Sequence, residues 1–95
     1  MEIKINAVKF KADEKLNQFI IDKVSKLEHH AQGILSAEVS LNVDKPESDN
    51  NKVADIRLVV RGNDLYASKR ASTFEEAVKD AIDALKPQVE KFKDK

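Results

Sequence analysis

The sequence predicts an α+β fold, a two-layer α/β sandwich in which two helices cover one face of a four-stranded mixed sheet, in the order β-α-β-β-β-α. Two observations predict it. Four segments alternate apolar and polar residues with period two, which is typical of strands with one buried face. Two longer segments repeat apolar residues at spacings of three and four, which is typical of helices with one buried side. Elements of these two kinds pack as layers.

The composition favours one folded unit with a well-solvated surface. The chain has 95 residues, of which 41% are hydrophobic and 36% are charged, so we expect residues 1–95 to form a single domain with one modest core. No apolar run approaches the roughly 20 residues of a membrane-spanning helix, and the first residues lack the layout of a signal peptide. The absence of cysteine fits a reducing compartment. We therefore expect a cytoplasmic protein without a membrane partner.

The first strand and the first helix follow from the start of the chain. The strand is expected at residues 2–10 with a bulge near residues 6–7, because Phe10 falls out of phase with the apolar residues before it. The helix begins after Asp13, whose carboxylate can accept from the first free amides. Gly33 stands where a left-handed cap would end the helix. The apolar positions of this helix are Leu16, Phe19, Ile20, Val24, Leu27 and Ala31.

The three remaining strands occupy the middle of the chain. Residues 36–44 alternate strictly, and residues 45–52 form a polar connection. Residues 53–71 are expected to fold into a hairpin about the three-residue turn Gly62-Asn63-Asp64, since glycine tolerates the positive φ of a tight reversal. The β-α-β start makes the first two strands parallel, and the later, shorter joins suit antiparallel neighbours. The expected core face consists of Ala37, Val39, Leu41, Val43, Ala54, Ile56, Leu58, Val60, Leu65 and Ala67.

The second helix is expected near the end of the chain. Ser72 and Thr73 each have a glutamate three residues on, so two overlapping capping boxes can start it. Pro87 removes the amide that would bond to the carbonyl of Asp83, yet the apolar pattern continues to Phe92, so we expect a kinked continuation. The apolar stripe consists of Phe74, Ala77, Val78, Ala81, Ile82, Leu85, Val89 and Phe92.

Patterns for catalysis and metal binding are nearly absent. His29 and His30 are adjacent, so on a helix they project about 100° apart and do not share a metal easily. With only two glycines, a Gly-rich phosphate loop is excluded. Ser68 and Ser72 have no histidine nearby in the sequence. We therefore expect no enzyme activity, no catalytic residue, no metal or other cofactor and no small-molecule substrate.

The positive charges are sorted into rows although the formal net charge is zero. At about 100° per residue, one flank of the first helix carries Lys15, Lys23, Lys26 and His30. A spacing of seven residues, which keeps side chains in one nearly straight row, relates Lys79, Lys86 and Lys93 in the second helix. The acidic residues expected to face away from that row are Glu76, Asp80, Asp83, Glu90 and Asp94.

If the helices lie side by side, the two basic rows border one groove, which Lys69 and Arg70 would enter just before the second helix. Such a groove suits a phosphate backbone, where each contact adds affinity and salt dependence. Spacing alone leaves two interpretations open: an RNA-binding surface, or an ordinary solvated surface whose lysines extend over the edge of the core. Tyr66 likewise fits either stacking on a base or packing against a neighbouring strand.

Four segments together match a known family. They are LNQFIIDKVSKLEHH (16–30), AEVSLNVDK (37–45), KVADIRLVVRGNDLYASKRASTFEEAVKDAIDAL (52–85) and QVEKFKDK (88–95). With these segments the sequence resembles the ribosome-hibernation proteins, also called ribosome-associated inhibitors or sigma-54 modulation proteins, in their short form. The resemblance covers essentially the whole chain.

The resemblance implies a fold like that of double-stranded RNA-binding domains. It also implies binding in the mRNA and tRNA channel of the small ribosomal subunit, against its 16S rRNA, which blocks initiation and keeps idle ribosomes intact in stationary phase or stress. Family members use basic residues on both helices, and here Lys23 and Lys26 match the first helix while Lys91 and Lys93 match the basic tail. The full set of candidate RNA-binding residues is Lys23, Lys26, Lys69, Arg70, Lys79, Lys86, Lys91 and Lys93.

The sequence departs from the family pattern in the second helix. Residues 75–79 replace a Tyr-Ala-Ala-Ile-Asp run, and Ala84 and Pro87 stand at typically basic positions, for which Lys79 and Lys86 are expected to compensate. Because the resemblance is to the short form, it implies that the extra domain by which long members pair ribosomes is not expected here, so pairing would need a second hibernation factor. Silencing of single ribosomes and promotion of dimers both stay open. The alternative function is a protein-binding regulatory adapter, for example of a transcription factor, without ribosome binding.

Overall fold

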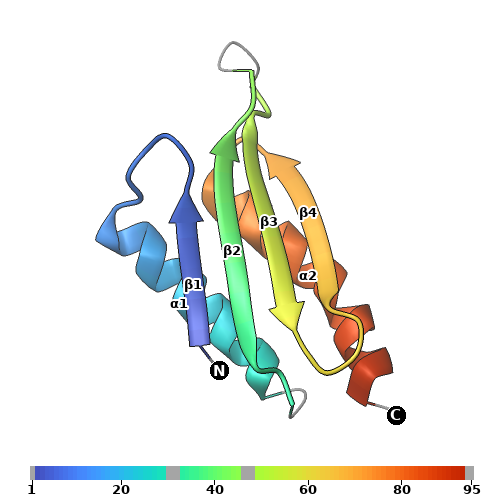
Figure 1. Ribbon diagram of the computed structural model, residues 1–95. Coiled ribbons are helices and arrows are strands. Elements are labelled where there is room, and N and C mark those ends of the chain that lie inside the picture. The colour runs from blue at the N-terminus through green and yellow to red at the C-terminus, as the bar shows by residue number, and fades with distance from the viewer. Residues whose placement is uncertain (1, 30–32, 46–48, 94–95) are drawn as a thin grey trace.

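The computed structural model describes residues 2–29, 33–45 and 49–93. Both helices lie on the same face of one sheet (Figure 1), so the predicted two-layer fold and its β-α-β-β-β-α order are confirmed. The elements are β1 (Glu2–Ala7), α1 (Glu14–Glu28), β2 (Ser36–Val43), β3 (Lys52–Val59), β4 (Leu65–Ala71) and α2 (Phe74–Lys93).

The sheet has the strand order β1-β2-β3-β4. β1 runs parallel to β2, whereas β2, β3 and β4 are successively antiparallel. This is the predicted arrangement, because the α1 crossover returns the chain in the same direction and the later connections are short. The edges of the sheet are therefore β1 and β4.

The core fills the space between the sheet and the two helices. β3 contributes Ala54, Ile56 and Leu58, which are completely buried as their alternation predicts. The helices contribute buried residues at spacings of three and four, namely Ile20, Val24 and Leu27 from α1, and Ala77, Val78, Ala81, Ile82, Leu85 and Val89 from α2. Val43, which we expected in the core, is exposed at the end of β2.

The first strand is shorter than predicted. It ends at Ala7 instead of residue 10, and it pairs one-to-one with β2 along its whole length, so it has no bulge. In the following turn Lys9 has a φ of 64°. This reversal places Phe10 against Phe74 at the start of α2, with ring centroids 5.0 Å apart. A turn with one left-handed residue therefore produces the change of phase that we had assigned to a bulge.

The helix ends show which capping groups operate. Asp13 caps α1 as predicted, since its Oδ1 accepts from the backbone N–H of Leu16 at 2.7 Å. α1 ends at His29 in a right-handed conformation, so Gly33, with a φ of 96°, belongs to the connection before β2 and does not cap the helix. The predicted helix positions His30 and Ala31 lie outside the described residues.

α2 uses one of its two possible capping residues. Thr73 Oγ1 accepts from the backbone N–H of Glu76 at 3.1 Å, whereas the hydroxyl of Ser72 donates to Asn50 Oδ1 at 2.8 Å. The helix then continues through Pro87 to Lys93, as its apolar pattern predicts.

The β3–β4 turn is wider than the three residues predicted. The last pair between these strands is Leu58 with Leu65, and β3 ends at Val59, so residues 60–64 make the connection. Gly62 has the expected positive φ, 93°. Inside the turn Asp64 Oδ1 accepts from the backbone N–H of Val60 at 3.4 Å.

Candidate nucleic-acid interface

A groove between α1 and α2 brings together four of the predicted RNA-binding residues. Its basic rim is formed by Lys23 and Lys26 from α1 and by Lys79 and Lys86 from α2, and it encloses about 210 Å³. Leu27 and Ile82, both buried, contribute apolar surface to its lining. The prediction that the two basic rows border one groove is confirmed for these lysines; we call this feature the interhelical groove.

The position of the groove is determined by which residues of the two helices are buried. In α1, burial of Val24 and Leu27 leaves Lys23 and Lys26, which are three residues apart and so neighbours on the surface, at the shoulder facing α2. In α2, Lys79 and Lys86 lie two turns apart, roughly 10 Å along the axis. The result is a short basic groove between the two helices.

The groove also contains a carboxylate. Lys86 Nζ lies 3.3 Å from Asp83 Oδ1, and both side chains are more than half exposed. The prediction that Asp83 faces away from the basic row is wrong, because residues three apart on a helix are neighbours. Four lysines minus one aspartate leave a formal charge of +3 in the lining. An exposed pair of this kind contributes about 0–1 kcal/mol, so a phosphate can displace Asp83 from Lys86.

Lys23 has an aromatic partner within its own helix. Its Nζ lies 5.6 Å from the centroid of the Phe19 ring, one turn earlier. A cation above an aromatic face is attracted by about 0.5–1 kcal/mol at an exposed site. This contact holds the ammonium group beside the groove, and within residues 2–29, 33–45 and 49–93 Lys23 forms no ion pair with a carboxylate.

Lys91 and Lys93 do not belong to the described lining of the groove. Lys91 is exposed near the end of α2 and shares a separate hollow with Arg61 of the β3–β4 turn. Arg61 was not among the residues predicted from the sequence. The one signal for it there is that it follows Val60, which is buried. The side chain of Lys93 lies outside the described part of the structure.

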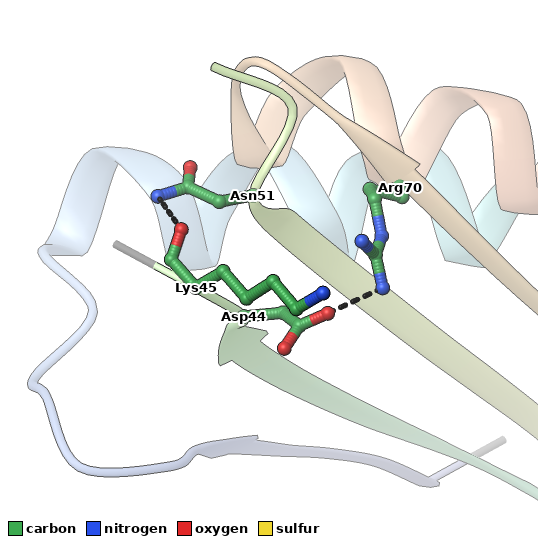
Figure 2. Close-up of polar contacts among 4 residues, drawn as sticks. All are labelled: Asp44, Lys45, Asn51 and Arg70. Atoms are coloured by element: carbon green, nitrogen blue, oxygen red, sulfur yellow. Dashed lines mark hydrogen bonds and ion pairs between the residues drawn. The ribbon is translucent and has the colours of Figure 1, made fainter. Parts of the chain in front are cut away.

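Arg70 and Lys69 also lie away from the groove, so the prediction that they enter it is wrong. Arg70 stands on the open face of the sheet, where its guanidinium forms an ion pair with Asp44 just after β2 (Figure 2). Lys69 lies on the helix-covered face of the sheet, but because β4 is an edge strand this residue is exposed. Their proposed role in RNA binding stays a prediction.

The Arg70–Asp44 pair belongs to a set of contacts at the base of the β2–β3 connection (Figure 2). Asn51, only 4% exposed, donates from Nδ2 to the backbone oxygen of Lys45 at 3.5 Å and accepts from Lys52 Nζ at 2.6 Å. Lys45 has a φ of 46°. These contacts give Arg70 a structural role in joining β4 to the end of β2.

Gln88 is a polar residue that the sequence analysis overlooked. Its Nε2 donates to the backbone oxygen of Tyr66 at 2.8 Å, and its Oε1 accepts from the Tyr66 backbone N–H at 3.2 Å. The side-chain amide thus pairs with edge strand β4 as a neighbouring peptide would. The Tyr66 hydroxyl donates to Asp55 Oδ1 at 3.2 Å, which favours cross-strand packing over base stacking for this half-exposed ring.

Metal binding and membrane spanning each require a feature that can be sought in the part of the chain that the structure describes. In residues 2–29, 33–45 and 49–93, no three histidine, cysteine, aspartate or glutamate side chains gather where they could hold a metal ion. In the same residues, neither helix has the length and apolar character that crossing a membrane requires.

Comparison with known proteins gives consistent matches over the whole chain. The family described as "Sigma 54 modulation protein / S30EA ribosomal protein" matches residues 3–95. Two curated relatives, the ribosome hibernation promoting factors of Salmonella typhimurium and Klebsiella oxytoca, are each 30% identical over 95 residues, which is 100% of this chain and 96% of the relative.

Solved structures agree on the fold. The Protein Y N-terminal domain of Thermus thermophilus has a TM-score of 0.83 at 22% identity, covering 97% of this chain and 99% of that one. A ribosomal subunit interface protein from Coxiella burnetii has a TM-score of 0.79 at 18% identity, covering 100% of both chains. At these identities the two structures support the shared fold alone.

Proposed function

The chain belongs to the sigma 54 modulation protein / S30EA ribosomal protein family, and from that membership we propose that it is a ribosome-associated inhibitor of translation. Residues 1–95 would act as one cytoplasmic domain that binds the small ribosomal subunit in the mRNA and tRNA channel, against 16S rRNA. Binding there would block initiation and promote ribosome hibernation in stationary phase or stress. A second hibernation factor, as an additional partner, stays a prediction.

The interhelical groove is the observation that carries the RNA-binding part of this proposal. It combines four lysines on two helices with a formal charge of +3 in its lining. Lysines that neutralise phosphates release counterions, which provides affinity without sequence specificity. That property suits a protein that must bind one structured RNA by its shape and charge.

Membership of this family also concerns the question of enzyme activity. Its curated relatives are named for promoting ribosome hibernation, and the family consists of ribosome-binding proteins that are not enzymes. The prediction that this chain is not an enzyme agrees with that membership.

The test is binding to purified small ribosomal subunits. We expect the wild-type chain to sediment with them at low salt, and the double variant Lys79→Gln/Lys86→Gln to bind at least tenfold more weakly, since two phosphate contacts are lost. The matched control is Lys4→Gln/Arg57→Gln, which removes two exposed cations from the open sheet face. Circular dichroism should show unchanged helix content in both variants.

Two results would contradict the proposal. If the wild-type protein stays at the top of a sucrose gradient that contains small subunits at low salt, binding to the small subunit is excluded. If a captured protein partner stays bound after RNase treatment, and if its affinity depends only weakly on salt, the regulatory adapter is favoured.

A further inference from the structure

The β3–β4 turn lies beside the last turns of α2 at one end of the molecule (Figure 1). Residues of this turn and of α2 line a second basic hollow. It encloses about 420 Å³, and its two cations are Arg61 from the turn and Lys91 from the helix. We call it the turn hollow. It contains none of the four lysines of the interhelical groove, so it is a separate surface.

The two basic surfaces lie on different flanks of α2. Lys91 follows Lys86 by five residues, which turns it roughly 140° around the helix axis. Lys86 therefore faces α1, whereas Lys91 faces the β3–β4 turn. Arg61 meets Lys91 there because Val60 before it is buried and Leu58 pairs with Leu65 after it, which directs the turn along this side of α2.

The cations of the turn hollow are available to a ligand. Both Arg61 and Lys91 are exposed, and within the described part of the chain neither forms an ion pair with a carboxylate. Among the described residues of the lining, Asp64 is the one acid, and it accepts from the backbone N–H of Val60. Two cations minus one carboxylate leave a formal charge of +1.

The shape of the turn also suits a polyanion. At Gly62, an added Cβ would meet no atom within 4 Å, so the backbone here is open to close approach. Asn63 beside it is exposed and can donate hydrogen bonds from its amide. The end of a helix has a partial negative charge that opposes a phosphate. Arg61 offsets it with a planar guanidinium that can bind phosphate through two parallel hydrogen bonds.

From these observations we infer that the turn hollow is a second phosphate-binding surface for the same RNA, so that the RNA contacts α2 on both flanks. Arg61 is then an RNA-binding residue in a turn, outside the helices. The inference rests on the proposed function and specifies it: the groove supplies one set of phosphate contacts, and Arg61 with Lys91 supplies another.

The first experiment compares Arg61→Gln/Lys91→Gln with the control Lys4→Gln/Arg57→Gln, which has the same change of net charge on the open sheet face. Affinity for purified small ribosomal subunits is measured over a series of KCl concentrations. Each lost phosphate contact should reduce the slope of log K against log salt by about 0.7–0.9. We expect the hollow variant to lose between one and two contacts and the control to lose none.

The second experiment locates the RNA directly. The chain has no cysteine, so Asn63→Cys can carry a single photoactivatable cross-linker at the hollow, and Asn42→Cys carries it on the open face of β2 as a matched control. We expect cross-links to 16S rRNA from position 63 at a higher yield than from position 42.

The outcomes separate this inference from the proposed function. If the groove variant weakens binding while the hollow variant behaves like the control and position 63 gives no cross-link, the turn hollow is not an RNA site and the proposed function stands. If the wild-type chain does not bind small subunits, the proposed function and this inference are both overturned.

Discussion

Asp83 shows how one side chain sets the charge of the interhelical groove. Its carboxylate lies 3.3 Å from Lys86, and among the described residues of the lining it is the one acid beside four lysines. Because the pair is exposed, water and salt screen it, and it holds Lys86 only weakly. Asp83 therefore competes with an incoming phosphate for the same lysine.

Removing that competitor should strengthen RNA binding. We expect Asp83→Asn to raise the affinity for small ribosomal subunits by about three- to tenfold at low salt, because the charge of the groove increases by one. Asp80→Asn is the matched control, since it makes the same change on the same helix at a residue outside the groove lining. Equal effects of the two substitutions in a filter-binding assay would show that only net charge matters.

At the scale of elements, α2 stabilises the fold through apolar contacts with the sheet and polar contacts with the edge strand β4. Its buried residues cover the sheet, while Gln88 bonds to both backbone groups of Tyr66 on β4. An edge strand otherwise presents free N–H and C=O groups to other chains. Gln88 thus fixes the position of α2 over the edge and closes one pairing position of β4.

Loss of this bridge should be measurable in both stability and exchange. We expect Gln88→Ala to lower the free energy of unfolding by about 1 kcal/mol, since exposed hydrogen bonds contribute modestly. The backbone amide of Tyr66 should then exchange faster with solvent. Gln18→Ala is the control, because within the described part of the chain the side chain of Gln18 bonds to Asp22 on the surface of its own helix, α1. An unchanged exchange rate at Tyr66 would show that Gln88 does not protect the edge.

At the scale of the whole molecule, zero net charge conceals a local concentration of positive charge in the interhelical groove, although α1 and α2 together carry eight acidic and seven basic residues. The helical face carries the four groove lysines. On the open face of the sheet the charges alternate across neighbouring strands, because Glu38 pairs in register with Lys4 on one side and Arg57 on the other. Among these surfaces, the interhelical groove is therefore the one that attracts a polyanion.

This local concentration of cations predicts strongly salt-dependent binding by a neutral protein. With six cations in contact, four in the groove and two in the turn hollow, the slope of log K against log salt should be about −4 or steeper. Titration of small-subunit binding with KCl measures it. A slope near zero would show that binding does not depend on phosphate contacts and would leave the two basic surfaces without that role.

The sequence by itself determined the features that depend on near neighbours. Alternation placed the strands and their buried residues, Asp13 identified the start of α1, and the spacing of the lysines predicted the groove. Each of these depends on residues within about two helical turns, where the geometry of a helix or strand is fixed. That is why the fold, its order and half of the candidate RNA-binding residues could be placed before the structure was known.

Only the tertiary structure decided the contacts between distant segments. The Gln88–Tyr66 bridge, the meeting of Arg61 with Lys91 and the pairing of Arg70 with Asp44 join residues 22 to 30 positions apart. They depend on the register of the strands and on the rotation of α2 about its own axis, which burial of Ala77, Ala81 and Leu85 sets. Local periodicity says which face of an element is apolar, but packing against the other layer decides what each polar side chain meets.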